Sequence, residues 1–69
     1  MKEIDARGLS CPQPVILLKQ ALADQPQTCK IWVDHPTARE NTLRFAAHAG
    51  YKADILEQGG DVCLTLSKK

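Results

Sequence analysis

The amino-acid sequence predicts an α/β fold, a two-layer sandwich with two helices on one face of a four-stranded sheet, in the order βαβαββ. Two segments place apolar residues at helical spacing, and four shorter segments show the alternation typical of strands. Each predicted helix has a single apolar stripe, so both can cover the same sheet face and leave the other face open. A chain of 69 residues has room for one such domain, residues 1–69.

The first half of the chain contains two predicted strands and a helix. Residues 2–6 are expected to form a short strand, and residues 7–10 a loop. A helix is expected over residues 12–24, because proline is favoured in a first turn, where its missing N–H has no helical partner anyway. Residues 29–34 alternate as a second strand, with the odd-numbered residues facing the core.

The second half begins with a helix and ends with a hairpin. Thr37 and Glu40 have the spacing of a capping box, in which each side chain bonds the backbone amide of the other residue. This helix is expected to run to about Ala49. Two strands follow, over residues 51–57 and 61–67, and a Gly-Gly pair between them is a typical hairpin signal.

Helical and strand periodicity together predict which residues are buried. The core is expected to contain Leu18, Leu22, Ile31, Val33, Phe45, Ile55, Leu64 and Leu66. Cys29 is expected to join them as a small apolar side chain. Cys63 and Trp32 are expected on the open sheet face, with Cys63 pointing outward. Trp32 is either partly covered by neighbouring side chains or part of a contact surface.

Composition and charge argue against several classes of function. The formal net charge is +1, so the chain lacks the basic surplus that a nucleic-acid-binding protein needs. The longest apolar run, residues 14–18, is far below the roughly 20 residues of a membrane span, and no signal segment opens the chain. We therefore expect a cytoplasmic protein. Three widely spaced cysteines and two histidines match no disulfide framework and no zinc motif, so we expect no metal.

One motif, Cys11-Pro12-Gln13-Pro14, carries chemistry of its own. It places a thiol at the start of a predicted helix, where the first-turn amides can lower a cysteine pKa from about 8.5 towards 7 or below. The prolines fix the local backbone, and Arg7 adds positive charge if the loop folds back. The thiolate is the form that attacks a sulfane sulfur and can carry it as a persulfide. The alternative is a cysteine that merely precedes a proline at a helix start.

The longer string from Asp5 to Val15, DARGLSCPQPV, resembles the signature of the TusA/SirA-like sulfur-carrier family. The resemblance continues at residues 33–38 and covers essentially the whole chain. It implies a mixed four-stranded sheet in the spatial order 1-2-4-3, with strand 4 antiparallel. It also implies that Cys11 accepts persulfide sulfur from a cysteine desulfurase and passes it to an acceptor protein, as in tRNA thiolation, without metal or organic cofactor.

The candidate site residues follow from the motif and from helical angles. Cys11 is expected to be the carrier nucleophile, supported in the loop and at the helix start by Asp5, Arg7, Gly8, Pro12 and Pro14. Gln13 and Ile16 are expected to contact a partner, because they lie near the thiol and Ile16 falls on the polar side of the helix.

Residues 38–41 and 50–51 are most similar to the amino-terminal domain of YedF-type proteins, which are associated with selenium metabolism and carry a second domain. His35 stands where the family usually has a second acidic residue. This similarity leaves two alternatives open. Residues 1–69 could be the first domain of a longer protein. The domain could also be a selenium-linked or regulatory thiol-binding module without sulfur transfer.

Overall fold

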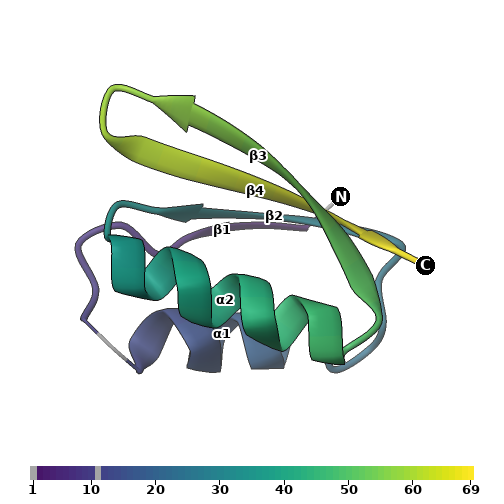
Figure 1. Ribbon diagram of the computed structural model, residues 1–69. Coiled ribbons are helices and arrows are strands. Elements are labelled where there is room, and N and C mark those ends of the chain that lie inside the picture. The colour runs from purple at the N-terminus through teal and green to yellow at the C-terminus, as the bar shows by residue number, and fades with distance from the viewer. Residues whose placement is uncertain (1, 11) are drawn as a thin grey trace.

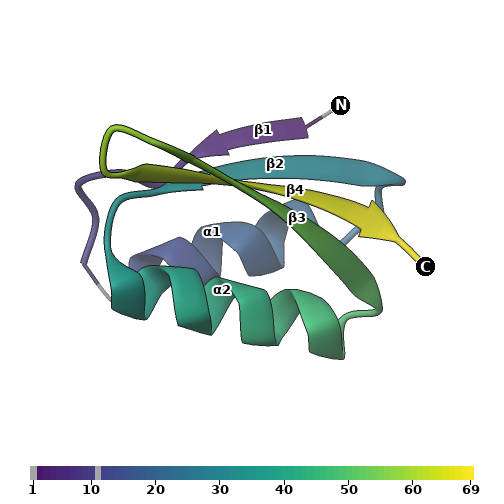
Figure 2. The same ribbon diagram turned by 45° about the horizontal axis from the view of Figure 1, so that its top comes forward.

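Two helices cover one face of a four-stranded sheet in the computed structural model, which describes residues 2–10 and 12–69 (Figure 1). The elements are β1 (Lys2–Asp5), α1 (Gln13–Ala21), β2 (Thr28–Val33), α2 (Pro36–His48), β3 (Tyr51–Gln58) and β4 (Asp61–Lys68). The predicted order βαβαββ is confirmed, and each predicted strand agrees within one residue at its ends. Both views place the two helices on the same side of the sheet (Figures 1 and 2).

The sheet has the order β1-β2-β4-β3 that the family resemblance implies. β1 and β2 are parallel, with Ile4 opposite Ile31, and β4 pairs antiparallel with both β2 and β3. Because β1 and β2 run in the same direction and each leads into a helix, both helices start at the same edge of the molecule (Figure 1). The two ends of the chain lie at the opposite edge. The topology therefore brings residues 6–10 beside residues 34–37.

Helix α1 is shorter than the helix predicted over residues 12–24. Pro12 occupies the position before the first helical residue, and the helix ends at Ala21. Residues 22–24 form a turn, and Gln25 adopts a left-handed φ of 52°, which directs the chain back toward β2. After Leu22 the backbone hydrogen bonds change to the tighter pattern of a turn, from the Ala23 N–H to Gln20 and from the Gln25 N–H to Leu22, so the α-helix ends early.

Helix α2 begins at Pro36, and the predicted capping box is wrong. His35 is the capping residue, and its Nδ1 accepts a hydrogen bond from the Thr37 N–H at 3.2 Å. Pro36 is the physical reason, since its fixed φ and missing N–H suit the first helical position and make the preceding residue the cap. Thr37 therefore lies inside the first turn, where its side chain cannot cap the helix.

The core lies between the helices and the sheet. Most of the residues predicted for it are buried, namely Leu18, Leu22, Ile31, Val33, Leu64 and Leu66, and Cys29 is buried with them. Phe45 is half-buried and packs against this cluster. The prediction for Ile55 is wrong, because its side chain is 44% exposed. The β3–β4 hairpin turns away from the helix layer at its far end (Figure 1). In agreement with this, residues 54–58 of β3 are all exposed.

The open sheet face carries Trp32, Cys63 and Leu56 side by side. Cys63 pairs in register with Trp32 on β2 and with Leu56 on β3. Its side chain is nevertheless only 2% exposed, so Cys63 lies on the expected face but does not point out into solvent. Residues directly opposite one another in a sheet have adjacent side chains, and the larger Trp32 and Leu56 flank the cysteine on both sides. Trp32 itself is half-buried.

Candidate functional site

The loop after β1 is a tight turn that leads to Cys11, which itself lies outside the described residues. Ala6 is buried and extends the pairing of β1, since its N–H donates to the Trp32 carbonyl at 2.9 Å. Gly8 has a φ of +79°, a left-handed conformation that glycine adopts without steric cost. The Leu9 N–H donates back to the Ala6 carbonyl at 3.4 Å. The Arg-Gly-Leu part of the motif thus folds as a compact reversal of the chain.

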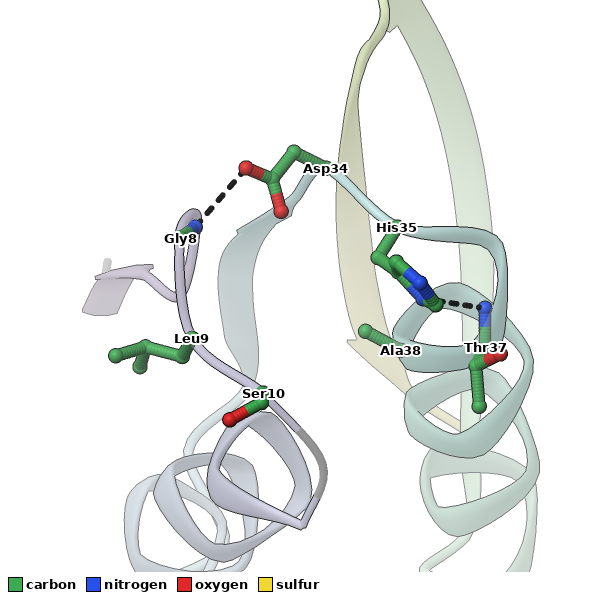
Figure 3. A pocket seen from close by; sticks show the side chains of 7 residues that line it. All are labelled: Gly8, Leu9, Ser10, Asp34, His35, Thr37 and Ala38. Atoms are coloured by element: carbon green, nitrogen blue, oxygen red, sulfur yellow. Dashed lines mark hydrogen bonds between the residues drawn. The ribbon is translucent and has the colours of Figure 1, made fainter.

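Asp34, which follows β2, contacts this loop from a different segment of the chain. Its Oδ2 accepts a hydrogen bond from the Gly8 N–H at 2.9 Å (Figure 3). Asp34 was not among the site residues predicted from the sequence. The available signal was its position directly after a strand that is parallel to β1, because the carboxyl ends of neighbouring parallel strands meet at one edge of a sheet. The bond joins the two loops at which α1 and α2 begin.

Arg7 points to the open sheet face. Its Nε and Nη2 donate to the two carboxylate oxygens of Asp5 at 2.9 Å each, and its Nη1 donates to Asp61 at 3.0 Å. The Arg7 side chain and backbone hydrogen bonds lower the pKa of Asp5 to about 2. Two carboxylates therefore balance the positive charge of Arg7. The sequence had suggested that this charge could lie near the Cys11 thiol. Asp5 and Arg7 shape the loop by tying it to β4.

Two backbone hydrogen bonds hold the described residues at the start of α1. The Gln13 N–H donates to the Ser10 carbonyl at 2.9 Å, and the Ile16 N–H donates to the Pro12 carbonyl at 3.1 Å. Pro14 is fully buried, so it anchors the first turn in the core besides setting its backbone. Gln13 and Ile16 are both exposed, Ile16 to 40%, as the helical angles predicted.

A pocket of about 380 Å³ lies between the two loops (Figure 3). Its lining comes from Gly8, Leu9 and Ser10 on one side and from Asp34, His35, Thr37 and Ala38 on the other. The walls of this pocket belong to segments that only the folded topology brings together. Within residues 2–10 and 12–69, no group of three or more His, Cys, Asp or Glu side chains could hold a metal ion. No described helix has both the length and the hydrophobicity needed to cross a bilayer.

The fold and the Cys-Pro-x-Pro helix start define a SirA-like α/β domain. The chain belongs to the TusA sulfurtransferase family, because the family model described as "Sulfurtransferase TusA" matches residues 2–68.

Individual relatives agree with this assignment. The sulfur carrier protein TusA of Pseudomonas syringae is 34% identical over 61 residues, which are 83% of this chain and 73% of that protein. The sulfur carrier protein TusA of Pseudomonas fluorescens is 33% identical over 60 residues, or 83% of this chain and 72% of that protein. The crystal structure of a SirA-like protein from Desulfitobacterium hafniense superposes with a TM-score of 0.87 at 35% identity, covering 97% of this chain and 96% of that one. These similarities support a sulfur-carrier role.

Proposed function

We propose that this protein carries sulfur as a persulfide on Cys11, between a cysteine desulfurase-type donor and an acceptor protein. The observation that carries the proposal is the Cys11-Pro12-Gln13-Pro14 string in a chain of the TusA family. The Cys11 thiolate attacks the terminal sulfur of the donor's persulfide and forms a new S–S bond. The donor's own cysteine sulfur leaves with the electron pair of the broken bond, so the step involves no net oxidation.

The electrostatics of α1 favour a thiolate at its start. The helix is nine residues long, and no acidic side chain lies in its first turn to oppose a negative charge there. Pro14 has no N–H, and the Gln13 and Ile16 N–H groups donate to the Ser10 and Pro12 carbonyls, so the favourable effect on an anion at this end comes from the dipole of α1. Arg7 is engaged by the carboxylates of Asp5 and Asp61, so the electrostatic argument rests on α1.

The two cysteines that the structure describes are poorly suited to carry sulfur. Cys29 is fully buried in the core, and this burial raises the pKa of its thiol. Cys63 is 2% exposed on the open face. A carrier must meet the cysteine of a donor and then that of an acceptor, and a buried thiol cannot do this without local unfolding. Cys11 remains the candidate.

The exposed side chains around the start of α1 offer a surface for the partners. Gln13 and Ile16 are exposed on the helix, and Leu9 is 37% exposed in the preceding loop. An apolar side chain that is exposed in the free protein gains energy when a partner covers it. We propose that donor and acceptor both dock here, and that the acceptor belongs to a sulfur-trafficking route such as tRNA thiolation.

The test is incubation with a cysteine desulfurase and cysteine, followed by intact mass measurement. We expect a gain of one sulfur atom that a reducing agent reverses. Cys11→Ser should abolish the gain, and Cys63→Ala should keep it. If the wild-type chain gains no sulfur, the selenium-linked or regulatory thiol module becomes the better reading. If Cys11→Ser still gains sulfur, the assignment of the carrier residue is wrong.

A further inference from the structure

We propose that Asp34 is a positioning residue for sulfur transfer, which acts by holding the loop that leads to Cys11. The inference rests on the proposed function and assigns to it a residue outside the Cys-Pro-x-Pro motif. Asp34 lies in the connection between β2 and α2, and its carboxylate accepts the Gly8 N–H at 2.9 Å (Figure 3). A hydrogen bond to a charged acceptor is among the stronger ones that an exposed loop can make.

The backbone N–H groups of Arg7, Gly8 and Leu9 are consecutive, and their hydrogen-bond acceptors come from different parts of the chain. The Arg7 N–H donates to the Asp5 carboxylate at 3.1 Å, and the Leu9 N–H donates to the Ala6 carbonyl at 3.4 Å. Both of these acceptors belong to the same segment of chain as their donors. The partner of Gly8 comes from a separate loop. Of these three amide bonds, the one to Asp34 therefore ties the turn to a separate loop at the start of α2, whereas the other two fix only its internal shape. The Arg7 side chain ties the same turn to Asp61 of β4 on the other side.

The position of Gly8 is transmitted to the start of α1. Gly8 precedes Cys11 by three residues, and the chain is tied again where the Ser10 carbonyl accepts the Gln13 N–H at 2.9 Å. A displacement at Gly8 is therefore expected to reach Ser10 and, through its bond to Gln13, the start of α1. Small displacements of a reacting group can slow a transfer step by up to about a hundredfold.

A slower sulfur transfer in an Asp34 variant could also come from the loss of the negative charge of Asp34, not from the loss of its hydrogen bond to Gly8. Asp34 also lines the pocket between the loops, where its negative charge could act directly on a partner or on the thiol. Asp34→Ala removes both the charge and the hydrogen-bond acceptor. Asp34→Asn removes the same charge but keeps a carbonyl oxygen that can accept the Gly8 N–H. The comparison of the two variants therefore separates the loss of the acceptor from the loss of the charge, which both variants share.

The experiment measures sulfur loading of the full chain at saturating cysteine desulfurase and cysteine, by intact mass against time. Asp54→Ala is the matched control, since Asp54 is an exposed aspartate on β3, outside both loops. Melting curves of every variant set a temperature at which all are folded. We expect Asp34→Ala to load at least about fivefold more slowly, and Asp34→Asn and Asp54→Ala to stay within about twofold of wild type. The Gly8 amide should exchange with solvent faster in Asp34→Ala than in Asp34→Asn.

Two results would overturn the proposal. One is wild-type loading by Asp34→Ala, and the other is equal slowing of Asp34→Ala and Asp34→Asn, which would assign the effect to charge. If the wild-type chain takes up no sulfur, the proposed function fails. The positioning role is then judged from alkylation of Cys11 by iodoacetamide near neutral pH. Slower alkylation of Asp34→Ala than of Asp34→Asn supports it, and equal rates contradict it.

Discussion

The guanidinium carbon of Arg7 lies 5.2 Å from the centroid of the Trp32 ring, within the range of a cation–π contact. The same guanidinium is bonded to Asp5 and Asp61, and the Trp32 indole N–H donates to Glu3 at 3.1 Å. Trp32 is therefore partly covered by charged neighbours from β1 and from the loop that follows it. Through this cluster the loop before the thiol is packed onto the open sheet face.

The Asp5 carboxylate should titrate at an unusually low pH. Hydrogen bonds from Arg7 lower its pKa from the ordinary 3.8 to about 2. A lowered pKa in the folded state means that the Asp5 ion pair stabilises the fold above the ordinary pKa and is lost as the pH falls through about 2. NMR titration of the carboxyl carbon measures this directly. In Arg7→Ala the midpoint should rise toward its ordinary value, and an unchanged midpoint would mean that Arg7 is not the cause.

Cys11 should alkylate faster than Cys29 and Cys63 near neutral pH. The two latter thiols are buried, and burial raises the pKa of Cys29. A thiol at a helix start is expected to have a larger thiolate fraction. Mass spectrometry of peptides after timed iodoacetamide labelling distinguishes the three sites. Equal labelling in the folded protein would refute the prediction, whereas equal labelling only in denaturant is the expected control result.

Leu18→Ala should destabilise the protein by about 2–5 kcal/mol, because Leu18 is fully buried between the layers. Ile55→Ala is the control, since Ile55 is 44% exposed and its truncation should cost less than about 1 kcal/mol. Urea denaturation of both variants gives the two free energies of unfolding. Comparable losses for the two variants would contradict the arrangement of the core.

Ile16→Ala should slow sulfur transfer without lowering the melting temperature. Ile16 is 40% exposed on α1, so its removal costs little stability, while a well-buried contact with a partner contributes about 1 kcal/mol or more. Leu56→Ala is a suitable control, because Leu56 is 54% exposed on the open sheet face. Normal transfer by Ile16→Ala together with slow transfer by Leu56→Ala would place the docking surface on the sheet.

Periodicity in the sequence predicts the helices and strands and the face on which each side chain lies. It does not predict how much of that face another layer of the fold covers. Alternation along a strand tells which sheet face a side chain occupies, and Leu64 and Leu66 lie where it places them. It does not tell how far the opposing layer extends, so Ile55 was expected to be buried and is exposed. Cys63 is the converse case, on the expected face but covered by its cross-strand neighbours.

In the candidate site, features that depend on neighbouring residues were predicted, whereas contacts between distant parts of the chain were not. Local features could be predicted, such as the exposure of Gln13 and Ile16, because they depend on helical angles within a few residues. The link from Gly8 to Asp34 was not predicted, since the strand order alone does not give the register of β1 and β2 or the path of the two loops that follow them. The salt bridge from Arg7 to Asp61 depends on the same details.

The placement of the chain ends has a practical consequence. β1 starts at Lys2 and the chain reaches Lys69 at the edge opposite the two helix starts (Figures 1 and 2). An affinity handle or a surface tether joined at either end would sit across the length of the sheet from the loop before Cys11. The protein can therefore be immobilised through its termini while that loop faces solution, an orientation suited to measuring donor and acceptor binding on a sensor surface.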